Sequence, residues 1–284
     1  MARPRTAGRR QRGSRRRRPR RLGQNFLADP NLLEAIVRES HVGPDDIVLE
    51  IGGGEGALTG WLAPRVARLH VVELDERMRA ELEALAREHP NISLTWGDAM
   101  RLDLAALDPA PRKLVSNLPY SIATPLILRT IEELASIQEW TLLVQREIAD
   151  RLRAAPGSRV YGAPSVLVQL ACEVELLRTV DRAVFTPRPR VDSALLRLRR
   201  TGPAAGGRLR DLVRQAFAHR RKSLARSLDL GTGWGGRDVA RAALGEAGLP
   251  EDARAEALSP DDFVRLDAAL AEAGPAAGEE DRGG

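Results

Sequence analysis

The sequence predicts an α/β domain with a mostly parallel sheet, followed by a smaller domain made of helices. Strand-like and helix-like segments alternate from about residue 45 to about residue 200, which is typical of a parallel sheet with helices on both faces. Residues 201–207 consist of threonine, glycine, proline and alanine, a composition typical of a linker. Only helix-like segments follow the linker, so we expect the smaller domain there.

The expected strands are short apolar runs bounded by turns, and the expected helices lie between or after them. We expect strands at residues 45–51, 69–73, 92–96, 113–117 and 140–144. We expect helices of the α/β domain at residues 57–66, 124–134 and 146–154, with another that ends near residue 88. We expect helices of the smaller domain at residues 208–228, 237–247 and 260–271.

Charge and composition divide the chain into four segments. Residues 1–21 contain eleven arginines and no acid, so we expect a basic disordered tail there. We assign residues 22–200 to the α/β domain, residues 208–272 to the helical domain and residues 273–284 to a second disordered tail.

A second basic region covers residues 182–226, which hold thirteen basic residues and two acids. Arg220, Arg221 and Lys222 interleave there with apolar residues at helical spacing, so we expect them on the outer face of a helix. Basic regions of this density usually contact nucleic acid phosphates, although an arginine-rich terminus alone can equally be a solvated tail.

Several classes of protein are excluded by simple features of the sequence. No stretch approaches the roughly 18 uninterrupted apolar residues that a membrane span requires. Cys172 is the single cysteine and cannot form an intramolecular disulfide, and no apolar segment follows the first arginines as it does in a secretory signal. We therefore expect a cytoplasmic protein. The four histidines show no ligand spacing, so we expect no metal.

The first chemical signal is a glycine-rich turn, residues 50–56, between an expected strand and an expected helix. Glycines let the backbone approach a ligand closely, and the N–H groups of the following helix point at it. Such a loop alone can also be a plain turn. Glu73 ends the next strand, where it can accept hydrogen bonds from ribose hydroxyls, and Asp98 follows the third strand, where it can reach an adenine amino group. This set fits NAD and S-adenosylmethionine alike.

The fourth expected strand ends at Asn117-Leu118-Pro119-Tyr120, which favours S-adenosylmethionine. Pro119 rigidifies the turn and disfavours helical geometry at Leu118, so the Asn117 amide and a neighbouring carbonyl can converge beside the Tyr120 ring. Two acceptors that hold the hydrogens of an adenine N6 favour a pyramidal nitrogen, whose lone pair can attack a methyl sulfonium. No strong base is required, because the nitrogen becomes acidic once it is methylated. The alternative is a helix-capping asparagine.

Several ordered motifs together resemble the ribosomal RNA adenine N6-dimethyltransferase family. They are LGQNFL at residues 22–27, EIGGG at 50–54, NLPY at 117–120, QRE at 145–147, YG at 161–162 and FTPRPRVDS at 185–193. The resemblance runs from about residue 20 to about residue 270. It implies a Rossmann-like methyltransferase domain with a small helical C-terminal domain, S-adenosylmethionine as cofactor and ribosomal RNA as partner. Many relatives have proline where this chain has Gly53.

The resemblance also implies site residues. The cofactor site would be lined by Asn25, Leu27, Gly52, Glu73, Asp98 and Asn117. The catalytic set would be Asn117, Leu118, Pro119, Tyr120 and Phe185. Tyr120 and Phe185 each lie in a proline-containing loop, and we expect them to clamp a base taken out of its stack, since stacking on aromatic side chains contributes about 1–3 kcal/mol per base. The alternative for Phe185 is a core residue that anchors its loop.

Two branches of the family act on different RNA. Residues 144–162 and 216–222 resemble the small-subunit (16S) branch more closely, whereas the arginine-rich start is similar to some macrolide-resistance enzymes of high-GC bacteria. We predict a dimethyltransferase that acts on N6 of adenines in 16S ribosomal RNA, within an immature small subunit, during ribosome biogenesis. The alternatives are a large-subunit (23S) resistance methyltransferase, a nicotinamide-dependent oxidoreductase and a noncatalytic RNA-binding assembly factor.

Overall fold

A seven-stranded sheet organises the α/β domain in the computed structural model, which describes residues 26–27 and 29–273. Five parallel strands stand side by side in the order β4-β3-β2-β5-β6. Their bounds are Ile47–Ile51 for β2, Arg68–Glu73 for β3, Ile92–Trp96 for β4, Lys113–Asn117 for β5 and Glu139–Gln145 for β6. The chain order reverses between β2 and β5, and ligand crevices of open α/β sheets form at such a switch point.

Two antiparallel strands, β9 (Ser193–Arg200) and β7 (Cys172–Val180), extend the sheet beyond β6. The sequence analysis did not anticipate them. Charged residues inside these strands hide the apolar pattern that predicts a buried strand. One of them, Arg197, is only 6% exposed, and its guanidinium lies within 4 Å of carboxylate oxygens of Glu39, Glu139 and Glu175. A separate two-stranded pair joins β1 (Phe26–Leu27) to β8 (Phe185–Thr186).

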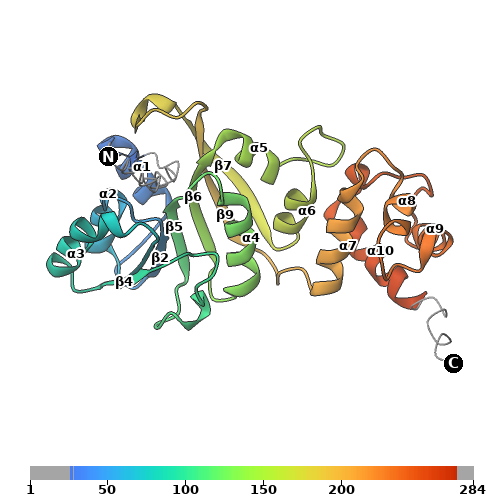
Figure 1. Ribbon diagram of the computed structural model, residues 1–284, viewed down its shortest axis with the longest axis horizontal. Coiled ribbons are helices and arrows are strands. Elements are labelled where there is room, and N and C mark those ends of the chain that lie inside the picture. Colours follow the sequence, from blue (N-terminus) through green and yellow to red (C-terminus); the bar gives the residue numbers. More distant parts are fainter. Residues whose placement is uncertain (1–25, 28, 274–284) are drawn as a thin grey trace, which may run out of the picture.

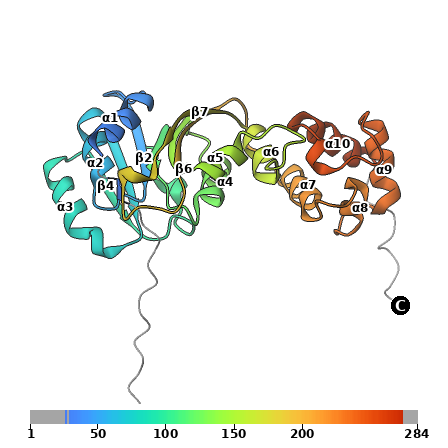
Figure 2. The same cartoon turned by 90° about the horizontal axis from the view of Figure 1, so that it is seen from above.

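Helices cover both faces of the sheet, as the strand and helix alternation predicts (Figure 2). One face is covered by α1 (Pro30–Glu39), α2 (Ala57–Leu62) and α3 (Arg79–Glu88), whose apolar side chains pack on those of β2 and β3. The other face is covered by α4 (Ala123–Glu133), α5 (Arg146–Leu152) and α6 (Ala163–Gln169). Two separate apolar cores therefore hold the carboxyl ends of the strands in place.

The helical domain is built from four helices of the described chain (Figure 1). They are α7 (Gly207–Ala218), α8 (Leu224–Asp229), α9 (Gly236–Glu246) and α10 (Pro260–Glu272). Their core also includes Tyr161, Val166 and Leu167, and the Tyr161 hydroxyl donates to the Leu258 carbonyl at 2.9 Å. Residues around α6 thus contribute to both domains, and the predicted linker lies between β9 and α7. The limits assigned to the domains stay a prediction.

One predicted helix is wrong. Residues 208–228 form two helices, α7 and α8, separated by residues 219–223. The segment His219-Arg220-Arg221-Lys222 has no apolar residue to bury, and Ser223 then adopts the extended conformation at the N-cap of α8. The three basic residues therefore lie exposed in a loop rather than on a helical face.

Elsewhere the predicted elements agree closely with the structure. The strands at residues 92–96 and 113–117 match β4 and β5 residue for residue. Among the described residues, no helix combines the length and apolar character that crossing a membrane would demand. Residues 1–25, 28 and 274–284 lie outside the described part of the chain, and with them the first predicted tail, all of the second except Ala273, and Asn25.

Candidate active site

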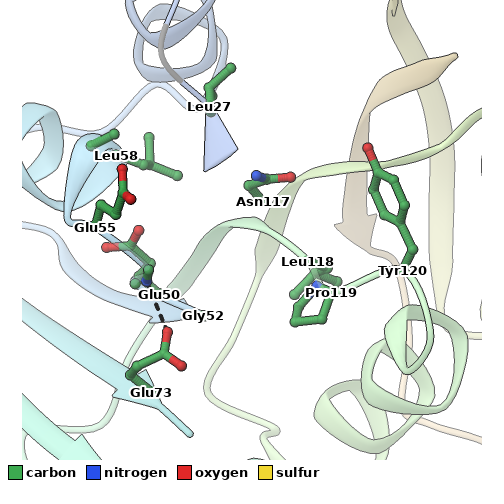
Figure 3. Close-up of a pocket in the computed structure, with 13 residues that line it drawn as sticks. Leu27, Glu50, Gly52, Glu55, Leu58, Glu73, Asn117, Leu118, Pro119 and Tyr120 are labelled. Carbon is green, nitrogen blue, oxygen red and sulfur yellow. Dashed lines mark hydrogen bonds between the residues drawn. The ribbon is translucent and has the colours of Figure 1, made fainter. Parts of the chain in front are cut away.

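A pocket opens at the carboxyl ends of β2, β3 and β5, at the switch point of the sheet (Figure 3). Its walls come from the glycine-rich turn, the end of β3, the turn after β5 and the strand β1. They comprise Leu27, Glu50, Gly52, Gly53, Gly54, Glu55, Ala57, Leu58, Glu73, Asn117, Leu118, Pro119 and Tyr120. The structure therefore brings together most of the residues that the sequence analysis placed in two adjoining sites.

The glycine-rich turn needs glycine for two different reasons. Gly52 and Gly54 have φ angles of +85° and +55°, the left-handed region that side chains rarely adopt. At Gly53 the obstacle is space, because an added Cβ would lie 2.6 Å from Cγ1 of Val71 on β3. The absence of a side chain at residue 53 thus lets this turn pack closely against Val71 of β3.

Glu73 is fixed by backbone amides at the end of β3. Its Oε2 accepts from the Gly54 N–H at 2.8 Å, drawn dashed in Figure 3, and its Oε1 accepts from the N–H groups of Leu74 at 2.8 Å and Asp75 at 2.7 Å. A carboxylate offers about four acceptor positions, so these three bonds leave about one for a ligand. A contact to two ribose hydroxyls requires the Gly54 bond to be released.

Glu50 is a pocket residue that the sequence analysis quoted in a motif but did not assign to the site. Its side chain is buried, and the Thr59 hydroxyl donates to its Oε2 at 2.7 Å. Burial raises the pKa of Glu50 to about 8, the nearby charge of Glu73 adds to the rise, and the Thr59 bond opposes it. Near neutral pH the carboxyl is therefore mostly protonated. The available signal was an acid inside an otherwise apolar strand.

The turn after β5 is held from two sides. The Leu118 N–H donates to the Leu143 carbonyl on β6 at 3.1 Å, and Leu118 is buried. The Tyr120 hydroxyl lies 2.7 Å from the Ser193 hydroxyl at the start of β9, and burial raises the pKa of Tyr120. In Figure 3 the Asn117 amide lies between Leu27 and the Tyr120 ring. An amide acceptor and an aromatic face thus border the same opening.

Two predicted site residues lie off the pocket wall. Asp98 sits in the loop after β4, where it accepts from the Met100 N–H at 2.9 Å and lies 3.6 Å from Arg101. Phe185 is 3% exposed, pairs with Leu27 across β1 and β8, and belongs to the core under α1. In this conformation the Phe185 ring cannot stack on a base. Its clamping role stays a prediction, since it requires the ring to leave that core.

Arg129 on α4 donates hydrogen bonds to the loop that carries Asp98. The sequence analysis did not identify Arg129 as a functional residue. Its Nη1 donates to the Ala99 carbonyl at 2.5 Å and its Nη2 to the Leu102 carbonyl at 2.8 Å, while its Nε donates to Glu133 at 2.8 Å. The side chain is 15% exposed. The only signal in the sequence was a single arginine inside an otherwise apolar helical stretch. Arg129 therefore ties the Asp98 loop to the helix that follows the Asn117–Tyr120 turn.

The chain matches the family described as Ribosomal RNA adenine dimethylase over residues 15–272. The chain belongs to this family. The match confirms the family and the enzyme class that the motifs predict, and it removes the nicotinamide-dependent oxidoreductase as an alternative. Among the described residues of this dimethylase, no group of three or more histidine, cysteine or acidic side chains could hold a metal ion.

Curated relatives of this dimethylase cover most of its length. "Ribosomal RNA small subunit methyltransferase A" of Rubrobacter xylanophilus is 43% identical over 87% of this chain and 92% of its own. The proteins of that name from Thermobifida fusca and Streptomyces griseus are 39% and 41% identical, each over 86% of this chain and over 88% and 86% of their own.

Two solved structures confirm the predicted fold class. A dimethyladenosine transferase from Plasmodium falciparum has a TM-score of 0.75 at 24% identity and covers 88% of this chain and 98% of its own. The 23S rRNA methyltransferase ErmE has a TM-score of 0.64 at 30% identity and covers 87% of this chain and 100% of its own. The fold is therefore the Rossmann-like methyltransferase domain with a helical C-terminal domain.

Proposed function

We propose that this dimethylase transfers methyl groups from S-adenosylmethionine to N6 of adenines in small-subunit (16S) ribosomal RNA, twice per adenine. The observation that carries the proposal is a single pocket in which the glycine-rich turn and Glu73 face the Asn117–Tyr120 turn. One half suits a nucleoside cofactor and the other suits a planar amine. A methyl donor and an adenine bound in these halves meet at the middle of the pocket.

The cofactor half positions its ligand through backbone and acids. The turn at residues 52–54 brings main-chain groups against the ligand, and Glu73 accepts from a ribose hydroxyl. Asp98 accepts from the adenine amino group when the loop held by Arg129 lies against the pocket. S-adenosylmethionine, when bound, supplies an electrophilic methyl group on sulfur.

The base half orients the attacking nitrogen. The Pro119 carbonyl already accepts from the Ile122 N–H at 3.1 Å, so the Leu118 carbonyl is the neighbouring acceptor that works with the Asn117 amide oxygen. These two acceptors hold the hydrogens of N6 and direct its lone pair toward the methyl group. The Tyr120 ring lies beside the base, fixed by Ser193. The proton leaves after methylation, when the nitrogen has become acidic, so a strong base is not needed.

The small-subunit assignment is supported by the degree of similarity. The relatives named as small-subunit methyltransferases are 39–43% identical to this chain, whereas the 23S methyltransferase structure is 30% identical. The substrate is then ribosomal RNA within an immature small subunit, and the enzyme acts in the cytoplasm.

Labelled S-adenosylmethionine distinguishes the branches directly. Purified immature small and large subunits are incubated separately with the enzyme, and dimethyladenine is mapped in each RNA. We expect label in the small-subunit RNA alone, and incorporation slower by about a hundredfold or more with the Asn117→Ala variant. Label confined to large-subunit RNA would assign the chain to the resistance branch, and no label in either would support the assembly-factor alternative.

A further inference from the structure

A second groove lies beside the active site, between α5 and the segment of residues 181–192. Three arginines, three acids and two valines line it: Arg146, Arg182, Arg190, Glu147, Asp150, Asp192, Val160 and Val191. None of these residues lines the pocket of the active site. The groove therefore presents arginine, acidic and aliphatic side chains that the proposed methyl transfer does not use.

The groove and the base half of the active site share one strand end. Val191 and Asp192 directly precede Ser193, whose hydroxyl lies 2.7 Å from the Tyr120 hydroxyl. The Arg146 N–H donates to the Asp192 carbonyl at 3.0 Å, which fixes the start of α5 against the same strand end. An RNA strand that leaves the base half on this side enters the groove at once.

The chemistry of the groove suits a nucleotide. Arg182 and Arg190 are exposed, and Nη1 of Arg182 donates to the Arg190 carbonyl at 2.9 Å, which leaves further guanidinium N–H groups for a phosphate. Val160 and Val191 are 41% and 44% exposed, and they are among the five large hydrophobic residues most exposed in the described chain. Apolar side chains beside arginines offer a surface for the base and donors for its phosphate.

The charge around the groove differs from that of the domain as a whole. Residues 146–160 and 181–192 hold seven arginines and four acids, whereas residues 22–181 hold 15 basic and 24 acidic residues. The basic surface continues toward the helical domain, because Nη2 of Arg220 donates to the Arg159 carbonyl at 3.2 Å. The exposed Arg221 and Lys222 follow in the loop between α7 and α8. Nη2 of Arg220 also lies 3.1 Å from Glu256, so Arg221 and Lys222 are the residues of this loop that can attract a polyanion.

We propose that this groove binds the RNA nucleotide next to the target adenine. Arg182 and Arg190 contact its phosphate, while Val160 and Val191 pack against its base. The proposal rests on the proposed function, because it takes the target adenine to lie beside Tyr120. The groove is then a second binding site for the RNA strand, outside the methylation pocket.

Phosphate interference tests the groove on the natural substrate. Immature small subunits whose RNA carries about one ethylated phosphate per molecule are methylated by the full-length enzyme, and the ethylated positions missing from the methylated fraction are mapped. The variant is Arg182→Gln/Arg190→Gln. The matched control is Arg38→Gln/Arg87→Gln, which removes two exposed arginines from α1 and α3.

For the wild type we expect interference at the phosphate next to the target adenine. The variant should lose that interference, and its KM for the subunit should rise about tenfold with kcat nearly unchanged, as loss of charge-assisted contacts implies. The control should keep both the interference and the KM. Interference that persists in the variant, or a variant KM equal to that of the wild type, would overturn the subsite.

Failure of the proposed function gives a different result. In that case the wild type methylates no small-subunit RNA, and the interference map is made instead on subunits retained by the protein. If an ethylated phosphate prevents retention by the wild type but not by the variant, the result would still support RNA binding in the groove. Variant binding equal to wild type for the subunits, together with weakened binding of a glutamate-rich peptide, would assign the groove to an acidic protein and overturn the RNA proposal.

Discussion

The two halves of the pocket are built in different ways. In the cofactor half, three backbone N–H groups fix Glu73, and Gly53 of the glycine turn packs closely against the Val71 side chain of β3. In the base half, a side-chain bond between Tyr120 and Ser193 joins the turn after β5 to the start of β9. The first half is preformed by the main chain of one αβ unit, while the second depends on strands far apart in the sequence. Substitutions should therefore act differently in the two halves.

The largest expected effect is in the base half. Asn117→Ala removes the amide acceptor that orients N6, and we expect kcat to fall by about a hundredfold or more, by analogy with the loss of one transition-state hydrogen bond. The affinity for S-adenosylmethionine should stay within a few fold of the wild type. Single-turnover methylation of immature small subunits measures the first quantity and calorimetry the second. A near-normal single-turnover rate would show that Asn117 does not position the amine.

The next effect belongs to the cofactor half. Glu73→Ala removes a charged acceptor, and we expect binding of S-adenosylmethionine to weaken by about 1.5–3 kcal/mol, which is about tenfold to a hundredfold. The variant also leaves the N–H groups of Gly54, Leu74 and Asp75 without their acceptor, so its melting temperature should be measured alongside. Glu73→Gln is the control that keeps one acceptor oxygen. A folded alanine variant with unchanged affinity would remove Glu73 from the cofactor site.

A smaller effect is expected from the link between the halves. Arg129→Met releases the carbonyls of Ala99 and Leu102 and loosens the loop that carries Asp98. We expect the KM for S-adenosylmethionine to rise by up to about tenfold with little change in kcat, because an acceptor is displaced and no reacting group is lost. Arg101→Gln is the matched control, since its exposed ion pair with Asp98 contributes little. If both variants have the same KM for S-adenosylmethionine, Arg129 does not position the Asp98 loop for cofactor binding.

The smallest effect on activity is expected from Glu50→Gln. This substitution should instead change how the free energy of unfolding depends on pH. Burial raises the pKa of Glu50 from 4.5 to about 8, so between these pH values the unfolded chain releases a proton that the folded chain keeps. The free energy of unfolding therefore falls as pH rises through this window. Glu50→Gln has no such proton, so its stability relative to the wild type should increase by up to a few kcal/mol from about pH 5 to about pH 8. Denaturant unfolding across this range is the measurement, and a pH-independent difference would contradict a buried neutral acid.

The parallel strands and the pocket residues on them could be predicted because each is a local signal. β2 is mostly apolar, β4 alternates apolar and polar residues, and β5 has two apolar residues at its centre. Glu73 and Asn117 stand at the strand ends where sheet topology brings side chains together. The predicted strand bounds therefore also located the pocket.

What could not be predicted depends on pairing between distant segments. Phe185 sits in a proline-containing loop that suggests exposure, yet its pairing with Leu27 places it in the core. Arg129 looks like a surface residue until the loop after β4 folds over it. The spacing of apolar residues around Arg220 predicts a helix. Residues 219–222 have no apolar side chain to bury, however, and α7 ends at Ala218. At Phe185 and Arg129 a tertiary contact overrides the local pattern, whereas at Arg220 the charges of the segment itself end the helix.

The division of the pocket is tested most directly by single-turnover methylation of immature small subunits at saturating S-adenosylmethionine, with Glu73→Ala and Asn117→Ala compared side by side. If Glu73 binds the cofactor and Asn117 orients the amine, saturation should restore the Glu73 variant to nearly the wild-type rate and leave the Asn117 variant slower by about a hundredfold or more. Rescue of the Asn117 variant by cofactor, with the Glu73 variant still inactive, would contradict the assignment of the two halves.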